Sequence, residues 1–160
     1  MRAAVLTVSD GVHRGTRVDR SGDLLAELLA EQGFEVVRRV VPDEVGKIAE
    51  AIIALSGENA LVLTTGGTGF APRDVTPEAT RSAIDREAPG IAEAIRADAC
   101  ARTAHALLSR GAAGLRGAAL VVNLPGSPGG CRDGLAVLRP ALRHGLELAA
   151  GDQDSEHRQT

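Results

Sequence analysis

ALVLTTGGTG, residues 60–69, is the stretch of the sequence that decides the fold. Its first six residues form a mostly apolar run of the length of a buried strand, and this run passes directly into Gly66-Gly67-Thr68-Gly69. Shortly afterwards Thr76-Pro77-Glu78 has the pattern of a helix start, with Thr76 as the expected N-cap and Pro77 as the first helical residue. A strand, a glycine-rich turn and a helix in this order predict one βα unit.

The same alternation of apolar runs and amphipathic stretches continues on both sides of this unit. The predicted strands are 2–8, 34–41, 60–65 and 118–124. The predicted helices are 23–32 with Ser21 as N-cap and Gly33 as the stop, a stretch from Asp43-Glu44 to near Gly57, a helix after Thr76, a helix from Pro89 to about Leu108, and a last helix that carries Leu135, Leu138, Leu142 and Leu146. A turn-rich connection with Gly111, Gly114 and Gly117 is expected before the last strand.

Strands that alternate with helices predict an α/β fold: a three-layer αβα sandwich with a doubly wound, mostly parallel sheet and right-handed crossovers. The 160 residues, 44% of them hydrophobic, suit one domain with one core, which we expect over residues 1–151. Residues 152–160 are polar and are expected to form a disordered tail.

Composition argues against several classes of partner. The formal net charge is −3, only two Phe and no Trp or Tyr are present, and no stretch is rich in both Arg and aromatic residues, so we expect no nucleic-acid partner. No apolar segment has the length of a signal peptide core or a membrane span, which predicts a cytoplasmic protein without a membrane partner. Cys100 and Cys131 lie in no zinc-binding or disulfide pattern. Small molecules are the expected partners.

Polar clusters follow four predicted strands, where parallel α/β sheets bind their ligands. The clusters are Ser9-Asp10, Asp43, Thr64 to Gly69, and Asn123 to Pro128, and all should lie along one edge of the sheet. The glycines of the third cluster would let main-chain N–H groups turn around a phosphate, although the loop matches neither a Walker A motif nor GxGxxG. Read alone, it could equally be a tight turn that serves only the chain's geometry.

Asp43 and Asp74 are candidate Mg²⁺ ligands because carboxylates at a strand-end edge can hold the ion against substrate phosphates. Asp43 could instead cap its helix, and Asp74 could pair with Arg73 or act as an electrostatic cap. Three arginines of the first long loop could approach a triphosphate, although a solvated loop of mixed charge is the commoner outcome. They are Arg14, Arg17 and Arg20.

Several segments together resemble the MoaB/Mog family of molybdenum cofactor proteins, in order and spacing from about Arg2 to Gly151. These segments are TVSD (7–10), DRSG (19–22), PDE (42–44), TTGGTG (64–69), RDVTPEA (73–79), LSR (108–110) and NLPGSP (123–128). The pair TTGGTG and RDVTPEA is the most specific feature. After NLPGSP many family members carry Lys, whereas this chain has Gly129, and Arg132 could take over a cationic contact.

The resemblance implies adenylylation of molybdopterin by ATP with Mg²⁺, and release of pyrophosphate. The family's two important acidic positions correspond to Asp43 and Asp74, which would be both catalytic residues and metal ligands. The residues expected to contact nucleotide or pterin are Ser9, Asp10, Gly66, Gly67, Thr68, Gly69, Ser109, Asn123, Pro125, Gly126 and Ser127. Within this set, Gly66 to Gly69 would face the nucleotide, and Ser109, Asn123, Gly126 and Ser127 would seat the pterin. Similar proteins form homotrimers or homohexamers, and a later-acting molybdenum-insertion enzyme is an expected partner.

Two other functions remain open on the sequence. A binding-only member of the family would hold molybdopterin without transferring the nucleotide, as in part of the MoaB branch. A dinucleotide-dependent oxidoreductase would share the doubly wound pattern, but no GxGxxG follows the first strand. Retention of both acidic residues favours the adenylyltransferase.

Overall fold

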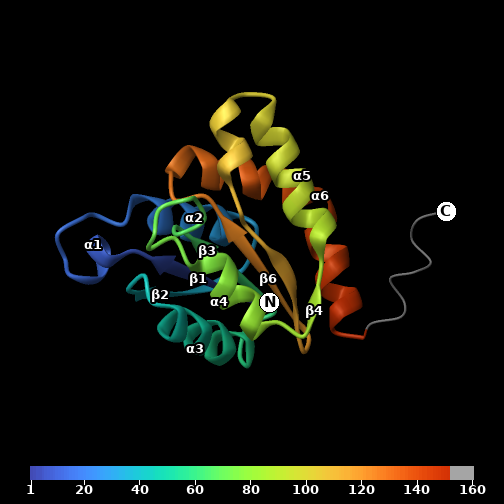
Figure 1. Cartoon of the computed structure of the whole chain (residues 1–160). Coiled ribbons are helices and arrows are strands. Elements are labelled where there is room, and N and C mark those ends of the chain that lie inside the picture. Colours follow the sequence, from blue (N-terminus) through green and yellow to red (C-terminus); the bar gives the residue numbers. More distant parts are fainter. Residues whose placement is uncertain (152–160) are drawn as a thin grey trace.

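The computed structural model describes residues 1–151 of the chain, and residues 152–160, with the predicted tail, lie outside this part. The strands are β1 (Arg2–Val8), β2 (Glu35–Val41), β3 (Leu61–Thr65), β4 (Arg86–Glu87), β5 (Ala113–Arg116) and β6 (Ala119–Leu124). The helices are α1 (Asp10–His13), α2 (Arg20–Glu31), α3 (Val45–Ser56), α4 (Thr76–Ala83), α5 (Pro89–Cys100), the 3₁₀-helix η1 (Ala104–Leu108) and α6 (Pro128–Ala149). Figure 1 shows their arrangement.

The six strands form one sheet in the order β2-β1-β3-β6-β5-β4. The first four strands in this order run parallel, whereas β5 pairs antiparallel with both β6 and β4. Because β1 lies between β2 and β3, the chain reverses its winding direction at β1, and a crevice opens there beyond the carboxyl ends of the strands. The prediction of a doubly wound, mostly parallel α/β sheet is confirmed.

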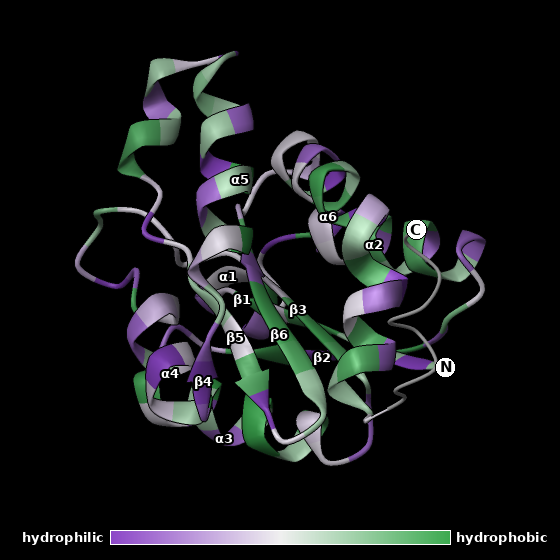
Figure 2. Cartoon of the chain, turned by 90° about the vertical axis from the view of Figure 1, so that its right-hand side faces the viewer, coloured by the Kyte–Doolittle hydropathy of each residue, from purple (hydrophilic) through white to green (hydrophobic). Residues whose placement is uncertain are grey.

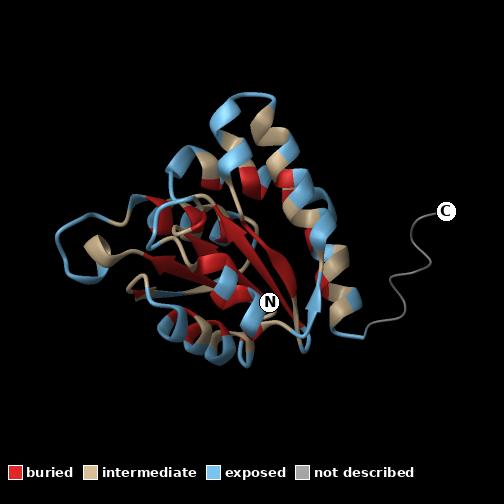
Figure 3. Ribbon diagram, viewed as in Figure 1, coloured by how far each residue is buried: buried red, intermediate tan, exposed pale blue. Residues whose placement is uncertain are grey.

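Helices cover both faces of the sheet. One face packs against α2, α5 and α6 and the other against α3 and α4, so that two separate layers of core form. Alternate residues of β1 enter the two layers, Ala3 and Val5 on one side, Ala4 and Leu6 on the other. Burial on both faces explains why the central strands are continuous apolar runs, which Figures 2 and 3 show as hydrophobic and buried.

Several helix boundaries differ from the prediction. The N-cap of α2 is Asp19, whose Oδ1 accepts from the N–H of Gly22, and Ser21 is already helical. Thr76 is the first residue of α4 and not its N-cap, because its hydroxyl donates to the Gly66 carbonyl. The helix from Pro89 ends at Cys100, and a separate 3₁₀ turn follows. The stop at Gly33 is confirmed by its left-handed φ of 85°.

The segment expected to be only a turn-rich connection contains a strand. β5 pairs with β6 through a tight turn at Gly117, whose φ is 54°. Position 114 of this strand is a glycine because an added Cβ there would collide with the Ile84 side chain and lie 2.5 Å from the Arg86 carbonyl oxygen. None of the helices in residues 1–151 is long and apolar enough to cross a membrane.

Candidate functional site

The parallel register brings the four predicted polar clusters to one edge of the sheet. Val41 of β2 lies beside Val8 of β1, so Asp43 follows next to Ser9. On the other side of β1, Thr65 pairs with Thr7 and with Leu124, which aligns the glycine-rich loop with the loop after β6. The prediction of a single edge is therefore confirmed.

Two aspartates at this edge hold each other through the main chain. The N–H of Asp10 donates to Asp43 Oδ2 at 2.8 Å, and the N–H of Asp43 donates to Asp10 Oδ1 at 3.1 Å. The guanidinium of Arg73 donates two hydrogen bonds to the carboxylate of Asp10, from Nε to Oδ2 at 2.6 Å and from a second nitrogen to Oδ1 at 3.0 Å. The N-cap position of α3 is Glu44, so Asp43 is not the helix cap that the sequence left open.

The glycine-rich loop passes between Asp43 and Asp74. A Cβ added to Gly67 would lie 3.3 Å from Asp43 Oδ1, and one added to Gly69 would lie 2.8 Å from Asp74 Oδ2. Gly66 and Gly67 have φ values of 99° and 65°, which side chains rarely allow. The glycines therefore permit two carboxylates and the loop to approach closely, as the predicted site requires.

Asp74 is held by its own loop. Its Oδ2 accepts from the N–H of Ala71 at 2.9 Å, while the neighbouring Arg73 turns to Asp10. Val75 occupies the N-cap position of α4, and no side chain caps this helix. Asp74 therefore does not pair with Arg73, and it forms no hydrogen bond that caps α4.

The electrostatic environment of the two bonded aspartates differs. The hydrogen bonds from Arg73 lower the pKa of Asp10, and the main-chain bond from Asp43 adds to this effect. Burial raises the pKa of Asp43, and the negative charges of Asp10 and Asp74 raise it further. A cation placed beside Asp43 and Asp74 would relieve this repulsion.

A metal at this edge would depend on its substrate. In residues 1–151 no group of three or more His, Cys, Asp or Glu side chains is arranged to hold an ion. Mg²⁺ is commonly bound through one or two carboxylates together with substrate phosphates and water. Asp43 and Asp74 fit this mode of binding, and a site formed by protein ligands alone does not.

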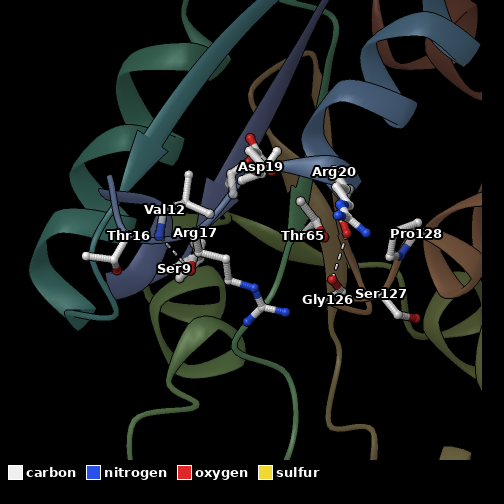
Figure 4. Close-up of a pocket in the computed structure, with 14 residues that line it drawn as sticks. Ser9, Val12, Thr16, Arg17, Asp19, Arg20, Thr65, Gly126, Ser127 and Pro128 are labelled. Carbon is white, nitrogen blue, oxygen red and sulfur yellow. Dashed lines mark hydrogen bonds between the residues drawn. The ribbon is translucent and has the colours of Figure 1, made fainter. Parts of the chain in front are cut away.

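A first cavity of about 700 Å³ opens between the carboxyl end of β1 and the starts of α2 and α6 (Figure 4). Arg17, from the loop after α1, and Ser127, the N-cap of α6, lie on opposite sides of it in this view. Arg20 also lines the cavity, whereas Arg14 is not among its lining residues. The N-terminus of α6 and the two arginines favour anionic ligands, whereas the N-terminus of α2 is already capped by the carboxylate of Asp19, which also lines the cavity.

A second cavity of about 540 Å³ lies between α5, η1 and the start of α6. Most of its lining consists of apolar residues and glycines, and several polar side chains also line it. The apolar and glycine wall residues include Ile95, Ala99, Ala106, Leu108, Pro125, Gly129, Gly130 and Gly134. The polar lining residues include Arg96, Arg102, His105, Ser109 and Asp133.

The loop from β6 to α6 separates the two cavities, and Ser127 lines both. Three elements hold its carbonyl groups: Ser21 donates to Gly126 O at 2.7 Å, Thr65 donates to Pro125 O at 2.8 Å, and the thiol of Cys131 contacts Pro125 O at 3.1 Å. Burial raises the pKa of Cys131 to about 11, so it stays a neutral donor near neutral pH.

The predicted contact residues fall into distinct places. Ser9, Gly126 and Ser127 line the first cavity, and Gly69, Ser109, Pro125 and Ser127 line the second. The remaining predicted residues line neither of these cavities. Asp10, Asp43, Gly66, Gly67 and Asp74 form the edge described above, and Thr68 and Asn123 are buried.

The side chain of Asn123 is fully hydrogen-bonded inside the protein. Its amide nitrogen donates to the hydroxyls of Thr64 and Thr80, and its Oδ1 accepts from the N–H of Ala112. Both amide hydrogens are thus used, and the residue is 5% exposed. Asn123 supports the strands beneath the site, and a contact of its side chain with the pterin stays a prediction.

Three side chains near the site were missed in the sequence. The sequence pattern assigns Ser21 to a helix cap, includes Arg110 only within LSR and gives no role to Asp133. Arg110 directly follows the cavity residue Ser109, and this position is the one signal in the sequence that points to it.

Comparison with known proteins matches residues 4–144 to the family described as "Probable molybdopterin binding domain". The molybdopterin adenylyltransferase of Helicobacter pylori strain J99 is 37% identical over 153 residues, which cover 92% of this chain and 87% of that protein. The molybdenum cofactor synthesis protein cinnamon of Drosophila melanogaster is 39% identical over 152 residues, but the chain spans only 25% of its length. The crystal structure of the molybdopterin biosynthesis enzyme MoaB from Thermus thermophilus superposes with a TM-score of 0.87 at 47% identity, over 94% of this chain and 96% of that one.

Proposed function

Because the chain belongs to the MoaB/Mog family of molybdopterin-binding domains, which act in molybdenum cofactor biosynthesis, we propose that it adenylylates molybdopterin. In this reaction an oxygen of the molybdopterin phosphate attacks the α-phosphorus of ATP. The new P–O bond forms as the bond from the α-phosphorus to the oxygen that bridges the α- and β-phosphorus atoms breaks, and this oxygen leaves with pyrophosphate. The products are adenylylated molybdopterin and pyrophosphate, and no covalent enzyme intermediate is required.

The observation that carries the proposal is the place of the acidic residues. Asp43 is bonded to Asp10, which follows the first-cavity residue Ser9, and Asp74 lies against Gly69, which lines the second cavity. Neither carboxylate lines a cavity, but each lies beside a residue or loop that does, and this supports a place for them near both substrates. A reaction that links two bound substrates needs its charged groups in such a place.

The two cavities differ in the way that the two substrates differ. The first has the N-terminus of α6 and the cations Arg17 and Arg20 beside the single acidic residue Asp19, and these groups suit a triphosphate. The second has apolar walls with polar groups around them, which suits a planar heterocycle with polar edges. We therefore assign ATP to the first cavity and the pterin to the second.

Mg²⁺, when bound by Asp43 and Asp74 with substrate phosphates, would supply positive charge that neutralises the phosphates of ATP. Asp10 positions Asp43 through the paired main-chain bonds, and Arg73 fixes Asp10. The aspartates would bind the metal ion and orient the substrates, and they need not transfer a proton, since a phosphate monoester is already ionised near neutral pH. Ser127 and the N–H groups at the start of α6 orient anionic oxygens between the two cavities.

Pyrophosphate release from ATP and molybdopterin tests the proposal directly. We expect Asp74→Asn to abolish release and to leave the fold intact, because the change is isosteric and the Asp74 side chain is held only by a local bond to Ala71. Asp98→Asn is the matched control, since Asp98 is an exposed partner of Arg102 outside both cavities.

A near-normal rate in Asp74→Asn would discard the assignment of Asp74. Tight binding of molybdopterin by the unaltered protein without any pyrophosphate release would instead identify a binding-only member of the family. Both results come from the same samples, so one experiment separates the two functions.

A further inference from the structure

Asp133 is a cavity residue that the proposed reaction does not use. It lies in the second turn of α6 and lines the second cavity across from the end of α5. Its Oδ2 is 3.2 Å from a guanidinium nitrogen of Arg102, and the same nitrogen lies 2.5 Å from Asp98 Oδ2. Among residues 1–151, no N–H or O–H group donates a hydrogen bond to Asp133 within ordinary geometry.

The shape of the second cavity decides which group meets this carboxylate. Gly129 and Gly130 leave the start of α6 without side chains on one side of the cavity, and Ala99 of α5 and Ala106 of η1 add only small side chains to its lining. A flat ring can lie against this lining and present its edge to the polar groups around it. On α6 that group is Asp133.

We propose that Asp133 selects the substrate by accepting hydrogen bonds from the 2-amino group and N3–H of the pterin. These two donors point in parallel, like the paired N–H groups of a guanidinium, and a carboxylate matches such a pair with its two oxygens. Arg102 holds the carboxylate at the cavity from its position at the end of α5. The inference rests on the proposed function for the identity of the ring that enters the second cavity.

An ion pair with Arg102 alone does not explain the position of Asp133. Arg102, just after the end of α5, already has Asp98 of that helix as an i, i+4 partner, and this contact is the shorter of the two. Exposed pairs of this kind contribute little to stability. A carboxylate that lines a mostly apolar cavity beside Arg102 is placed to accept hydrogen bonds from a donor that enters the cavity.

The test compares two fluorescent probes, 6-carboxypterin and 6-carboxylumazine, in direct titrations. The lumazine has a carbonyl in place of the 2-amino group, so it presents an acceptor where Asp133 needs a donor. Because the chain contains no Trp or Tyr, protein fluorescence does not interfere with the signal of either probe. We expect the unaltered protein to prefer the pterin by about tenfold or more, as for a hydrogen bond to a charged group.

Three variants give the comparison its controls. Asp133→Asn should lose the preference, because an amide can donate to the lumazine carbonyl as readily as it accepts from an amino group. Asp133→Glu should keep it, since the carboxylate is retained. Asp98→Asn should also keep it, although this change removes the other carboxylate beside Arg102. Circular dichroism and thermal unfolding would confirm that each variant is folded.

Equal affinity for the two probes in the unaltered protein, or no binding of either probe, would overturn the proposal. An unchanged preference in Asp133→Asn would do the same. Failure of the proposed function is distinguishable, because absence of pyrophosphate release leaves the binding preference in place. Conversely, an unchanged preference in Asp133→Asn, together with normal pyrophosphate release by the unaltered protein, would overturn only the role of Asp133.

Discussion

At the scale of single residues, the site depends on side chains that come from distant parts of the chain. Arg73 binds Asp10, 63 positions earlier, and Asp10 in turn exchanges main-chain hydrogen bonds with Asp43. The pKa of Asp10 is lowered mainly by this arginine. A carboxylate whose pKa is lowered by folding contributes stability above its unfolded-state pKa, and the contribution disappears as the pH falls through the folded-state value.

We therefore predict that Arg73→Gln lowers the urea midpoint at neutral pH and also reduces the loss of stability on acidification. The reason is that Asp10 then titrates nearer its ordinary pKa of 3.8. Urea unfolding between neutral pH and the acid range measures both effects. Arg81→Gln is the control, because Arg81 forms a longer pair with Glu87 away from the site. The same acid sensitivity in Arg73→Gln and in the unaltered protein would contradict the prediction.

The sequence identified Asp43 and Asp74 because polar residues directly after strands are visible in a one-dimensional pattern. It could not show that Arg73 turns to Asp10, because this contact joins two loops brought together by the sheet. It also placed Asn123 among the ligand contacts, although its amide is used between β3, α4 and the chain before β5. Position after a strand does not tell whether a side chain points into the ligand site or into the core.

At the scale of elements, Arg110 ties the loop that carries Asp74 to the wall of the second cavity. Its main-chain N–H donates to Thr68 O at 2.8 Å, and its guanidinium donates to Gly69 O at 2.8 Å, to Asp74 O at 2.6 Å and to Glu78. One side chain therefore holds both ends of the loop from Thr68 to Asp74. Its neighbour Ser109 lines the second cavity.

We predict that Arg110→Met lowers the free energy of unfolding by about 2 kcal/mol and strongly reduces pyrophosphate release, because several charge-assisted bonds are lost together. Arg110→Lys should recover little of the stability and activity lost in Arg110→Met, since an ammonium group cannot form the several hydrogen bonds of the planar guanidinium. Arg116→Met is the matched control: its side chain is equally exposed at 33%, and it donates to Ala83 O away from the cavities. Loss of activity in proportion to stability in both variants would contradict a specific role for Arg110.

The strands and most helices were predictable because apolar runs and helical periodicity are local signals. β5 was not, since AGLR contains no β-branched residue and lies among glycines that indicate a turn. The glycine at position 114 is required by the close approach of Ile84 and Arg86, which no local pattern reveals. Helix starts shifted by one or two residues where Asp19 and Thr76 bonded differently from the expected caps.

At the scale of the whole molecule, two large exposed apolar side chains are next in sequence to residues that line the second cavity. Phe70 is 67% exposed and Leu107 is 69% exposed, and they follow and precede the lining residues Gly69 and Leu108. Large apolar side chains that stay exposed in a single chain are often covered in an assembly. This placement supports the expectation of a homotrimer or homohexamer.

We predict a mass of three or six times the 16.5 kDa of the chain in light scattering coupled to size-exclusion chromatography. Phe70→Ser should weaken the assembly, so that its mass falls on dilution before that of the unaltered protein. Leu148→Ser is the control, because Leu148 is an exposed apolar residue at the far end of α6. A monomer at all concentrations would contradict the prediction.

The shared wall between the two cavities has a consequence for the end of the reaction. In the proposed reaction, the adenylylated product would occupy the cavities on both sides of Ser127, and neither half could dissociate while the other stayed bound. Bivalent binding of this kind would make the product dissociate far more slowly than either substrate. Product release would then limit the turnover rate. The expected later-acting molybdenum-insertion enzyme could raise this rate by taking the product directly from the protein.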